Sequence, residues 1–297
     1  MDETLKVRRG DLTLPVRSAG PDDGEPVIFL HGFPQTSAAW SPYLARFSAL
    51  GFRALAPDQR GYAMTARPTC VRQYAIDDLV ADVLGIADVL GVERFHLVGH
   101  DWGGVIGWAL AAACPDRLWS LTSVSTPHPR ALASSLWRSS QLARSWYVAF
   151  FQVPHLPERL LTAANGALLR RALRDSGLPD TNANAYLDTL LEPGAMRAAI
   201  NYYRALSPRR TLAVGRITVP TLYVWSTNDL ALGPVAARAT GGEIGGPYRF
   251  EVLDGVGHWI PETCVDELSG LVLDHLRMHP RIPSPISAES ESRDRGA

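Results

Sequence analysis

The sequence is poor in cysteine, and its three cysteines form no recognisable group. Cys70, Cys114 and Cys264 lie far apart in the chain and lack the spacing of a metal site or a redox pair. We therefore expect free thiols in a reducing compartment and no bound metal.

The chain also lacks an excess of charge and a long apolar run. It has 29 basic and 30 acidic residues, a net charge of −1, so it has no overall field to attract nucleic acid or an anionic membrane. No apolar stretch approaches the ~20 residues that span a bilayer. The first residues, MDETLKVRRGDLTLPV, lack the apolar segment of a secretory signal. These absences predict a cytoplasmic protein with no nucleic-acid or membrane partner.

What the sequence does have is an alternation of strand-like and helix-like segments in its first half. Hydrophobic residues make up 46 % of the 297, enough for a large core. Short apolar runs predict strands at 12–20, 26–32, 52–58, 95–100 and 118–126, and helical spacing predicts helices at 37–51, 73–90 and 102–114. Such β-α-β repetition is typical of an α/β protein with a mostly parallel sheet covered by helices on both faces.

The pattern changes after Thr126. Helical spacing, broken by proline and glycine, continues until Val219, where strands return at 219–229 and 248–258, followed by a helix at 264–278. We interpret residues 1–126 and 216–279 as one α/β core domain, and residues 127–215 as a helical cap inserted into it. Residues 280–297 are rich in proline, serine and charge, which predicts a disordered tail.

Asp101 stands in the stretch VGHDWGGVIG, between a predicted strand and a predicted helix. In the pattern G-x-S-x-G a nucleophilic serine occupies this place, at a sharp turn that glycines allow. A carboxylate there would lie at the carboxyl edge of the sheet, and the helix N-terminus would favour its ionised, nucleophilic form. The plain alternative is an N-cap aspartate. We expect Asp101 to attack an electrophilic carbon and to form an ester.

An ester intermediate must be hydrolysed, which requires a base. His258, in the glycine-flanked stretch DGVGHWIPE, has an unperturbed pKa of ~6.5, which would leave it mostly neutral and able to activate water. Asp229, in WSTND at the end of a predicted strand, would orient the imidazole. The order nucleophile, acid, histidine therefore predicts a triad of Asp101, Asp229 and His258.

The stretch LHGFPQTS, which directly follows a predicted strand, would stabilise the oxyanion of this hydrolysis. Gly32 allows a tight turn, and the Phe33–Pro34 bond is a candidate cis peptide. We expect the backbone N–H groups of Phe33 and Trp102 to point at the developing negative charge.

The motifs HGFP, APDQRGY, VGHDWGG, VPTLYVWSTND and GVGHWIPE resemble those of α/β-hydrolase fold epoxide hydrolases, in their order and spacing. The resemblance implies the α/β-hydrolase fold with a helical cap, and a reaction without cofactor that converts epoxides into vicinal diols. The substrates would be a small apolar epoxide and water, and a homodimer stays open as the assembly. Candidate walls of the apolar pocket are Phe33, Pro34, Trp102 and Phe151, with Trp108 and Phe150 as further candidates.

An opening epoxide becomes an alkoxide, which needs a proton donor opposite the nucleophile. The resemblance implies that two cap tyrosines supply it: Tyr147 in WYVAFFQVP and Tyr203 in NYYRAL. Tyr202 is the alternative to Tyr203. Ordinary aromatic packing is the alternative for both segments.

Two other functions stay open. Haloalkane dehalogenases share the aspartate nucleophile, and a haloalkane or haloacid dehalogenase would need N–H donors for the departing halide. Many dehalogenases have an asparagine where this chain has Phe33, whose side chain donates nothing, although Trp137 or Trp146 could supply an N–H from the cap. A non-catalytic binding protein of this fold would have no need for a water-activating base.

One motif departs from the family pattern. The family has DxRGYGxS where this chain has DQRGYAMT, so that Ala63 replaces a glycine. If that glycine takes a positive φ, Ala63 would change the turn near the pocket entrance.

Overall fold

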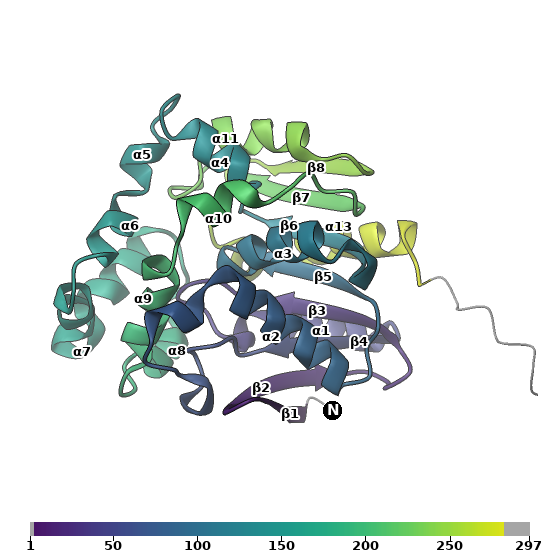
Figure 1. Ribbon diagram of the computed structural model, residues 1–297, viewed down its shortest axis with the longest axis horizontal. Helices are drawn as coiled ribbons and strands as arrows, with labels where there is room; N and C mark the ends of the chain where they lie inside the picture. Colours follow the sequence, from purple (N-terminus) through teal and green to yellow (C-terminus); the bar gives the residue numbers. More distant parts are fainter. Residues whose placement is uncertain (1–2, 282–297) are drawn as a thin grey trace, which may run out of the picture.

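The computed structural model describes residues 3–281, and their eight strands form one sheet in the order β1-β2-β4-β3-β5-β6-β7-β8 (Figure 1). β1 pairs antiparallel with β2, β2 pairs antiparallel with β4, and the other neighbours are parallel. This arrangement confirms the predicted α/β-hydrolase sheet. The strands are β1 Glu3–Arg9, β2 Leu12–Ala19, β3 Glu25–Leu30, β4 Phe52–Pro57, β5 Phe95–His100, β6 Leu118–Val124, β7 Thr221–Ser226 and β8 Tyr248–Leu253.

Helices occupy the connections, and most lie where their spacing predicts them. The predicted helix at 37–51 is a short 3-10 turn followed by α1, and the one at 73–90 likewise begins with a 3-10 turn. The α-helices are α1 Ser41–Ala49, α2 Ile76–Val89, α3 Trp102–Ala113, α4 Pro129–Ser135, α5 Gln141–Arg144, α6 Trp146–Phe151, α7 Leu156–Asp175, α8 Asp180–Leu190, α9 Ala195–Arg204, α10 Pro208–Ala213, α11 Pro234–Ala239, α12 Ile260–Thr263 and α13 Val265–Met278. The 3-10 helices are η1 Ser37–Trp40, η2 Met64–Ala66, η3 Val71–Tyr74, η4 Pro115–Arg117 and η5 Thr240–Glu243.

The directions of the connections decide where the sheet can bind a ligand. α1 leads from β3 to β4, whereas α2 and α3 lead the other way along the sheet, to β5 and then to β6. Because crossovers between parallel strands are right-handed, the two directions put α1 and α2 on opposite faces. The contacts agree, since α1 packs on α13 and α2 packs on α3. The direction reverses between β3 and β5, and open α/β sheets bind ligands at the carboxyl ends of such strands.

The described residues between β6 and β7 form helices only, from α4 to α10. α5 to α9 lie together beside one end of the strands (left in Figure 1), whereas α4 contacts both α10 and α11 near the sheet. We infer that these helices are the cap of residues 127–215. Within the described part of the chain, no helix has the length and apolarity that crossing a membrane would require.

The first strand, the turn at Ala63 and the C-terminal tail are taken in turn against the sequence. β1 was not predicted, because its sequence ETLKVRR is charged and mostly exposed, as suits an edge strand. Ala63 adopts an ordinary extended conformation with φ −94°, and the positive φ of this loop falls on Gly61. The predicted disordered tail lies, except for its first two residues, outside the described residues.

Candidate active site

Asp101 lies on the turn between β5 and α3, at the reversal point of the sheet. Its backbone has φ 51° and ψ −115°, a left-handed conformation that is strained for a residue with a side chain. The turn depends on close packing, because a Cβ on Gly103 would come within 2.2 Å of the Leu30 carbonyl oxygen. The strained turn therefore fixes the Asp101 carboxylate at the carboxyl edge of the sheet.

Two backbone N–H groups hold this carboxylate. The Phe33 amide donates to Asp101 Oδ1 over 2.8 Å, and the Trp102 amide donates to the same carboxylate. Gly32 permits the approach, since a Cβ there would lie 2.3 Å from Asp101 Cβ. The Phe33–Pro34 peptide is cis, which confirms that expectation. The predicted pair of N–H donors thus converges on the carboxylate of Asp101, the predicted nucleophile.

Asp229 and His258 reach the same edge from the loops after β7 and β8. His258 Nδ1 lies 2.8 Å from Asp229 Oδ2, and His258 Nε2 lies 3.8 Å from Asp101 Oδ2. Asp229 Oδ1 accepts the backbone N–H groups of Ala231 and Leu232 over 2.8 and 2.9 Å. With Nδ1–H donating to Asp229, the other ring nitrogen faces Asp101.

The charges at this site differ from the expectation of a mostly neutral histidine. Burial lowers the pKa of His258, but the charge and hydrogen bond of Asp229, together with the charge of Asp101, raise the pKa to about 9. At neutral pH the imidazole is therefore protonated, and the expectation was wrong because it left out both carboxylates. Burial raises the pKa of Asp101, and the charge of His258 and the two N–H groups partly offset this rise.

Tyr147 on α6 and Tyr203 on α9 face this carboxylate from the cap. Their ring centroids are 5.8 Å apart, and the Tyr203 ring lies 5.1 Å from that of Trp102. Burial, followed by the charge of Asp101, raises the pKa of both hydroxyls above the ordinary tyrosine value. Both tyrosines are therefore neutral hydrogen-bond donors at physiological pH.

Tyr202, the rival of Tyr203, points elsewhere. Its hydroxyl donates to the Arg60 carbonyl oxygen over 2.7 Å, and its ring packs on Tyr62 and Tyr74. Neighbouring side chains on a helix lie about 100° apart around its axis. The same helix thus directs Tyr203 towards Asp101 and Tyr202 into the core.

Aromatic side chains enclose the space between the tyrosines and the nucleophile. The Phe33 ring is 5.8 Å from Phe151, and the Phe151 ring is 4.9 Å from Tyr203. Pro34 is buried beside them. Phe150 is half-buried against Phe151. Trp108 does not belong to this wall. It is fully buried, and its indole N–H donates to the Thr126 carbonyl oxygen, so the predicted pocket is corrected here.

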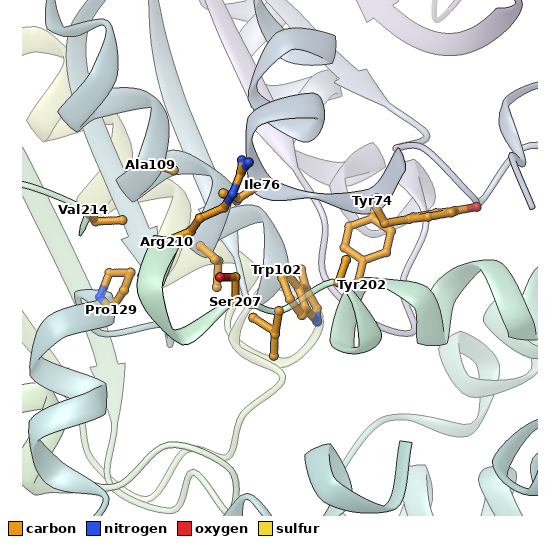
Figure 2. A pocket seen from close by; sticks show the side chains of 12 residues that line it. Tyr74, Ile76, Trp102, Ala109, Pro129, Tyr202, Ser207, Arg210 and Val214 are labelled. Carbon is orange, nitrogen blue, oxygen red and sulfur yellow. The ribbon is translucent and has the colours of Figure 1, made fainter. Parts of the chain in front are cut away.

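An apolar pocket lies beside Trp102, between α3, α9 and α10 (Figure 2). It is partly open to solvent. Tyr202, Val105 and Val214 line it with Trp102, and Arg210 stands at its edge, paired with Asp77. The indole of Trp102 therefore borders both this pocket and the tyrosines of the cap.

A buried polar cluster behind the site was not predicted. Gln35 Oε1 accepts the Gly32 N–H over 2.7 Å, and Gln35 Nε2 donates to Glu262 Oε1 over 2.6 Å. The hydroxyl of Tyr186, on cap helix α8, donates to the same Glu262 oxygen over 2.8 Å. The two core residues lie within quoted motifs, but no spacing in the sequence joins them to each other or to Tyr186. The cluster connects the oxyanion loop, the histidine loop and the cap.

The comparisons with known proteins agree with this geometry. The profile of the alpha/beta hydrolase fold family matches residues 25–263, and the chain belongs to this family. It is 32 % identical over 278 residues to AB hydrolase superfamily protein YfhM of Bacillus subtilis, covering 91 % of this chain and 96 % of the relative. It is 30 % identical over 288 residues to Epoxide hydrolase 4 of Homo sapiens, covering 93 % and 79 %. The structure of a Bacillus megaterium epoxide hydrolase with an inhibitor superposes with a TM-score of 0.83 at 25 % identity, covering 93 % and 100 %.

Proposed function

We propose that this protein is an epoxide hydrolase that converts small apolar epoxides into vicinal diols through an ester on Asp101. The observation that carries the proposal is the pair Tyr147 and Tyr203 facing a carboxylate that two backbone N–H groups hold. Relatives named epoxide hydrolases, and a Bacillus megaterium enzyme solved with a naphthyloxy propanediol product, support the same substrate class.

In the first step an Asp101 oxygen attacks an epoxide carbon, and the bond from that carbon to the epoxide oxygen breaks. The oxygen takes a proton from Tyr147 or Tyr203 as its charge develops. Because an alkoxide is a far stronger base than a tyrosinate, a tyrosine hydroxyl gives up its proton only as the ring opens and the alkoxide charge develops. The product of this step is an alkyl ester and a hydroxyl group on the neighbouring carbon.

In the second step water hydrolyses the ester. Esterification removes the negative charge of Asp101, one of the causes that raise the pKa of His258, so the imidazole then loses its proton more readily. That proton restores the tyrosine hydroxyl that was deprotonated in the first step. Neutral His258 takes a proton from water, the hydroxide attacks the ester carbonyl carbon, and the N–H groups of Phe33 and Trp102 stabilise the oxyanion. Collapse of the intermediate breaks the bond from this carbon to the alkyl oxygen, which takes the proton now held by His258 and leaves as the second hydroxyl group of the diol.

Dehalogenation is the weaker candidate on chemical grounds. A halide leaves already charged and needs N–H donors, whereas Tyr147 and Tyr203 supply hydroxyl protons. Trp137 and Trp146, the predicted cap donors for a halide, are 83 % and 65 % exposed to solvent. A binding protein without activity would have no use for a histidine held between two carboxylates.

Transfer of ¹⁸O from water to the protein tests whether an ester forms on Asp101. Turnover of styrene oxide in ¹⁸O-water over several cycles should place ¹⁸O in the carboxylate of the Asp101 peptide, because the water oxygen enters that carboxyl group. Label in the diol alone, with none in the peptide, would refute the ester mechanism. Release of halide from haloalkanes without any epoxide turnover would establish the dehalogenase instead.

A second experiment tests whether Tyr147 and Tyr203 donate the proton. Replacing Tyr147 and Tyr203 together by phenylalanine should slow ring opening by at least about 10²-fold, the usual contribution of a proton donor. Tyr202→Phe is the matched control, since its hydroxyl serves the Arg60 carbonyl and should leave ring opening nearly unchanged. An unchanged rate in the double variant would assign the proton donor to another group.

A further inference from the structure

Tryptophan is distributed unevenly between the interior and the surface. Six of the eight tryptophans are at most 9 % exposed, whereas Trp137 and Trp146 are 83 % and 65 % exposed. Both belong to the segment that leads from α4 to α6. A tryptophan side chain combines a large apolar ring with one N–H donor, which suits the boundary between water and lipid.

Further apolar side chains are exposed on the neighbouring elements. Leu142 on α5 and Leu156 at the start of α7 are 52 % and 45 % exposed, and Val153 between α6 and α7 is 40 % exposed. α5, α6 and α7 form the outer edge of the molecule, away from the sheet (Figure 1). We call Trp137, Leu142, Trp146, Val153 and Leu156 the outer cap surface.

The charge of this part of the chain is of one sign. Residues 127–157 contain no aspartate or glutamate, although the whole chain has 30 acidic residues. Their three arginines are Arg138, Arg144 and Arg130, of which Arg130 pairs with Glu243. The next acidic residue, Glu158, is paired with Arg204. Arg138 is exposed beside Trp137, and Arg159 is exposed one turn after Leu156. The outer cap surface is thus apolar and locally cationic, while the chain as a whole has a net charge of −1.

We propose that the outer cap surface docks on the anionic phospholipid surface of a bilayer. Tryptophan and arginine together match the apolar boundary and the phosphate groups of such a surface. A second copy of the chain fits less well, because a symmetric contact would bring these arginines together without a carboxylate between them. The net charge of −1 led us to expect no membrane partner. That net charge is a sum over the whole chain and hides the local excess of arginine at the outer cap surface.

The same short helix connects the surface to the site. On α6, Trp146 is exposed, whereas the next residue, Tyr147, faces Asp101, and Phe151 packs on Phe33. A bilayer against this helix would concentrate apolar substrate within one helix width of the nucleophile. The delivery of substrate from the bilayer rests on the proposed function, but binding of the outer cap surface to the bilayer does not.

Vesicle binding tests the docking without any turnover. The full chain should sediment with phosphatidylcholine vesicles that contain phosphatidylglycerol, and far less with phosphatidylcholine alone. Its tryptophan fluorescence should shift to shorter wavelength on binding. Replacing Arg138 and Arg159 by glutamine should weaken binding roughly 30-fold, since each basic side chain near an anionic surface contributes about fivefold.

Replacing Trp137 and Trp146 by serine should abolish both the sedimentation and the fluorescence shift. The matched control is the pair Leu50→Ser and Val89→Ser, exposed apolar residues on the core, which should bind like the parent chain. Absence of binding to anionic vesicles, or binding that neither pair of cap substitutions weakens, would overturn the proposal. So would a dimer of the parent chain that the tryptophan substitutions dissociate, since that result assigns the surface to a second copy.

Discussion

At the residue scale, the charge of His258 separates the two steps of the proposed reaction. The imidazole is protonated while Asp101 and Asp229 are both charged, and it becomes a base once an ester has neutralised Asp101. One histidine can therefore stabilise the nucleophile first and activate water later, without a change of position. The geometry that makes this possible is the placement of Nδ1 against Asp229 and Nε2 towards Asp101.

Replacing His258 by glutamine should stop the reaction between the two steps. Ring opening uses Asp101 and the tyrosines, so the alkylated enzyme should form in a burst and then accumulate, because no base activates water. Mass spectrometry of the intact protein after mixing with styrene oxide would detect the added mass. His279→Gln, far from the nucleophile, should turn over normally. A His258 variant that stays unmodified would contradict the assigned order of steps.

Replacing Asp229 by asparagine should shift the pH dependence of ester hydrolysis. Asp229 opposes the burial that lowers the pKa of His258, so its loss should bring that pKa down further in the ester, where Asp101 no longer raises it. The base form then persists to lower pH, and the acid limb of the profile should move to lower pH while the rate falls by roughly 10⁴-fold. Single-turnover decay of the ester between about pH 5 and pH 10, a range that includes the ordinary histidine pKa of ~6.5 and the raised value of about 9, would measure both effects. Asp254→Asn, an exposed partner of Thr227, should leave the profile in place.

At the element scale, the sequence predicted the strands that are buried on both faces and the edge strand β8, and it missed the other edge strand, β1. β5, β6 and β7 are buried at every residue, so their apolar runs stand out from the helices beside them. β1 pairs on one side only and is charged, and its register with β2 follows from the turn at Gly10 rather than from an apolar pattern.

The candidate site was predictable where each residue belongs to a local motif, and not where separate elements meet. Asp101 and Gly32 stand next to strand ends, which the sequence reveals. The choice between Tyr202 and Tyr203 depends on how α9 is rotated against the core, which no spacing within the helix decides. The bond between Tyr186 and Glu262 joins residues 76 positions apart, and it requires the folded cap.

The loop that contains Gly32 lies against the turn that carries Asp101, so Gly32→Ala should disturb the site. The added Cβ would meet Asp101 Cβ at 2.3 Å and Asp101 Oδ1 at 2.5 Å, so the loop or the carboxylate must move. Loss of the Phe33 N–H contact should lower kcat by about 10²–10³-fold, the usual cost of one oxyanion donor. Gly270→Ala on α13, where a Cβ meets nothing within 4 Å, is the matched control. Equal kcat values for the two variants would show that the loop adapts.

At the scale of the whole molecule, the cap is fastened to the core on several sides of the site. Tyr202 donates to the Arg60 carbonyl, Trp259 donates to Ser176 at the end of α7, and Tyr186 donates to Glu262. Two of these three bonds reach the loop that carries His258. The position of the cap and the position of the histidine are therefore coupled through hydrogen bonds.

A buried ion pair in the core holds Arg60, the residue whose carbonyl oxygen contacts the cap. Arg60 Nε and Nη2 each donate to one Asp82 oxygen over 2.7 Å, and both side chains are at most 10 % exposed. Removing one partner of such a pair leaves an unpaired buried charge, which costs about 3–5 kcal/mol. Because the Arg60 carbonyl accepts the hydroxyl of Tyr202 in the cap, a shift of Arg60 should also move the cap.

Asp82→Asn should therefore lower the free energy of unfolding by about 3–5 kcal/mol in urea denaturation. Asp88→Asn removes a similar contact to Arg117, but Asp88 is 63 % exposed, and solvent screening should limit its effect to at most about 1 kcal/mol. In Asp82→Asn, activity measured below the unfolding transition should also fall if the cap shifts with Arg60, whereas the Asp88 variant should keep full activity. Equal losses of stability in the two variants would show that the Arg60 charge finds solvent when its partner is removed, and that the pair does not anchor the cap.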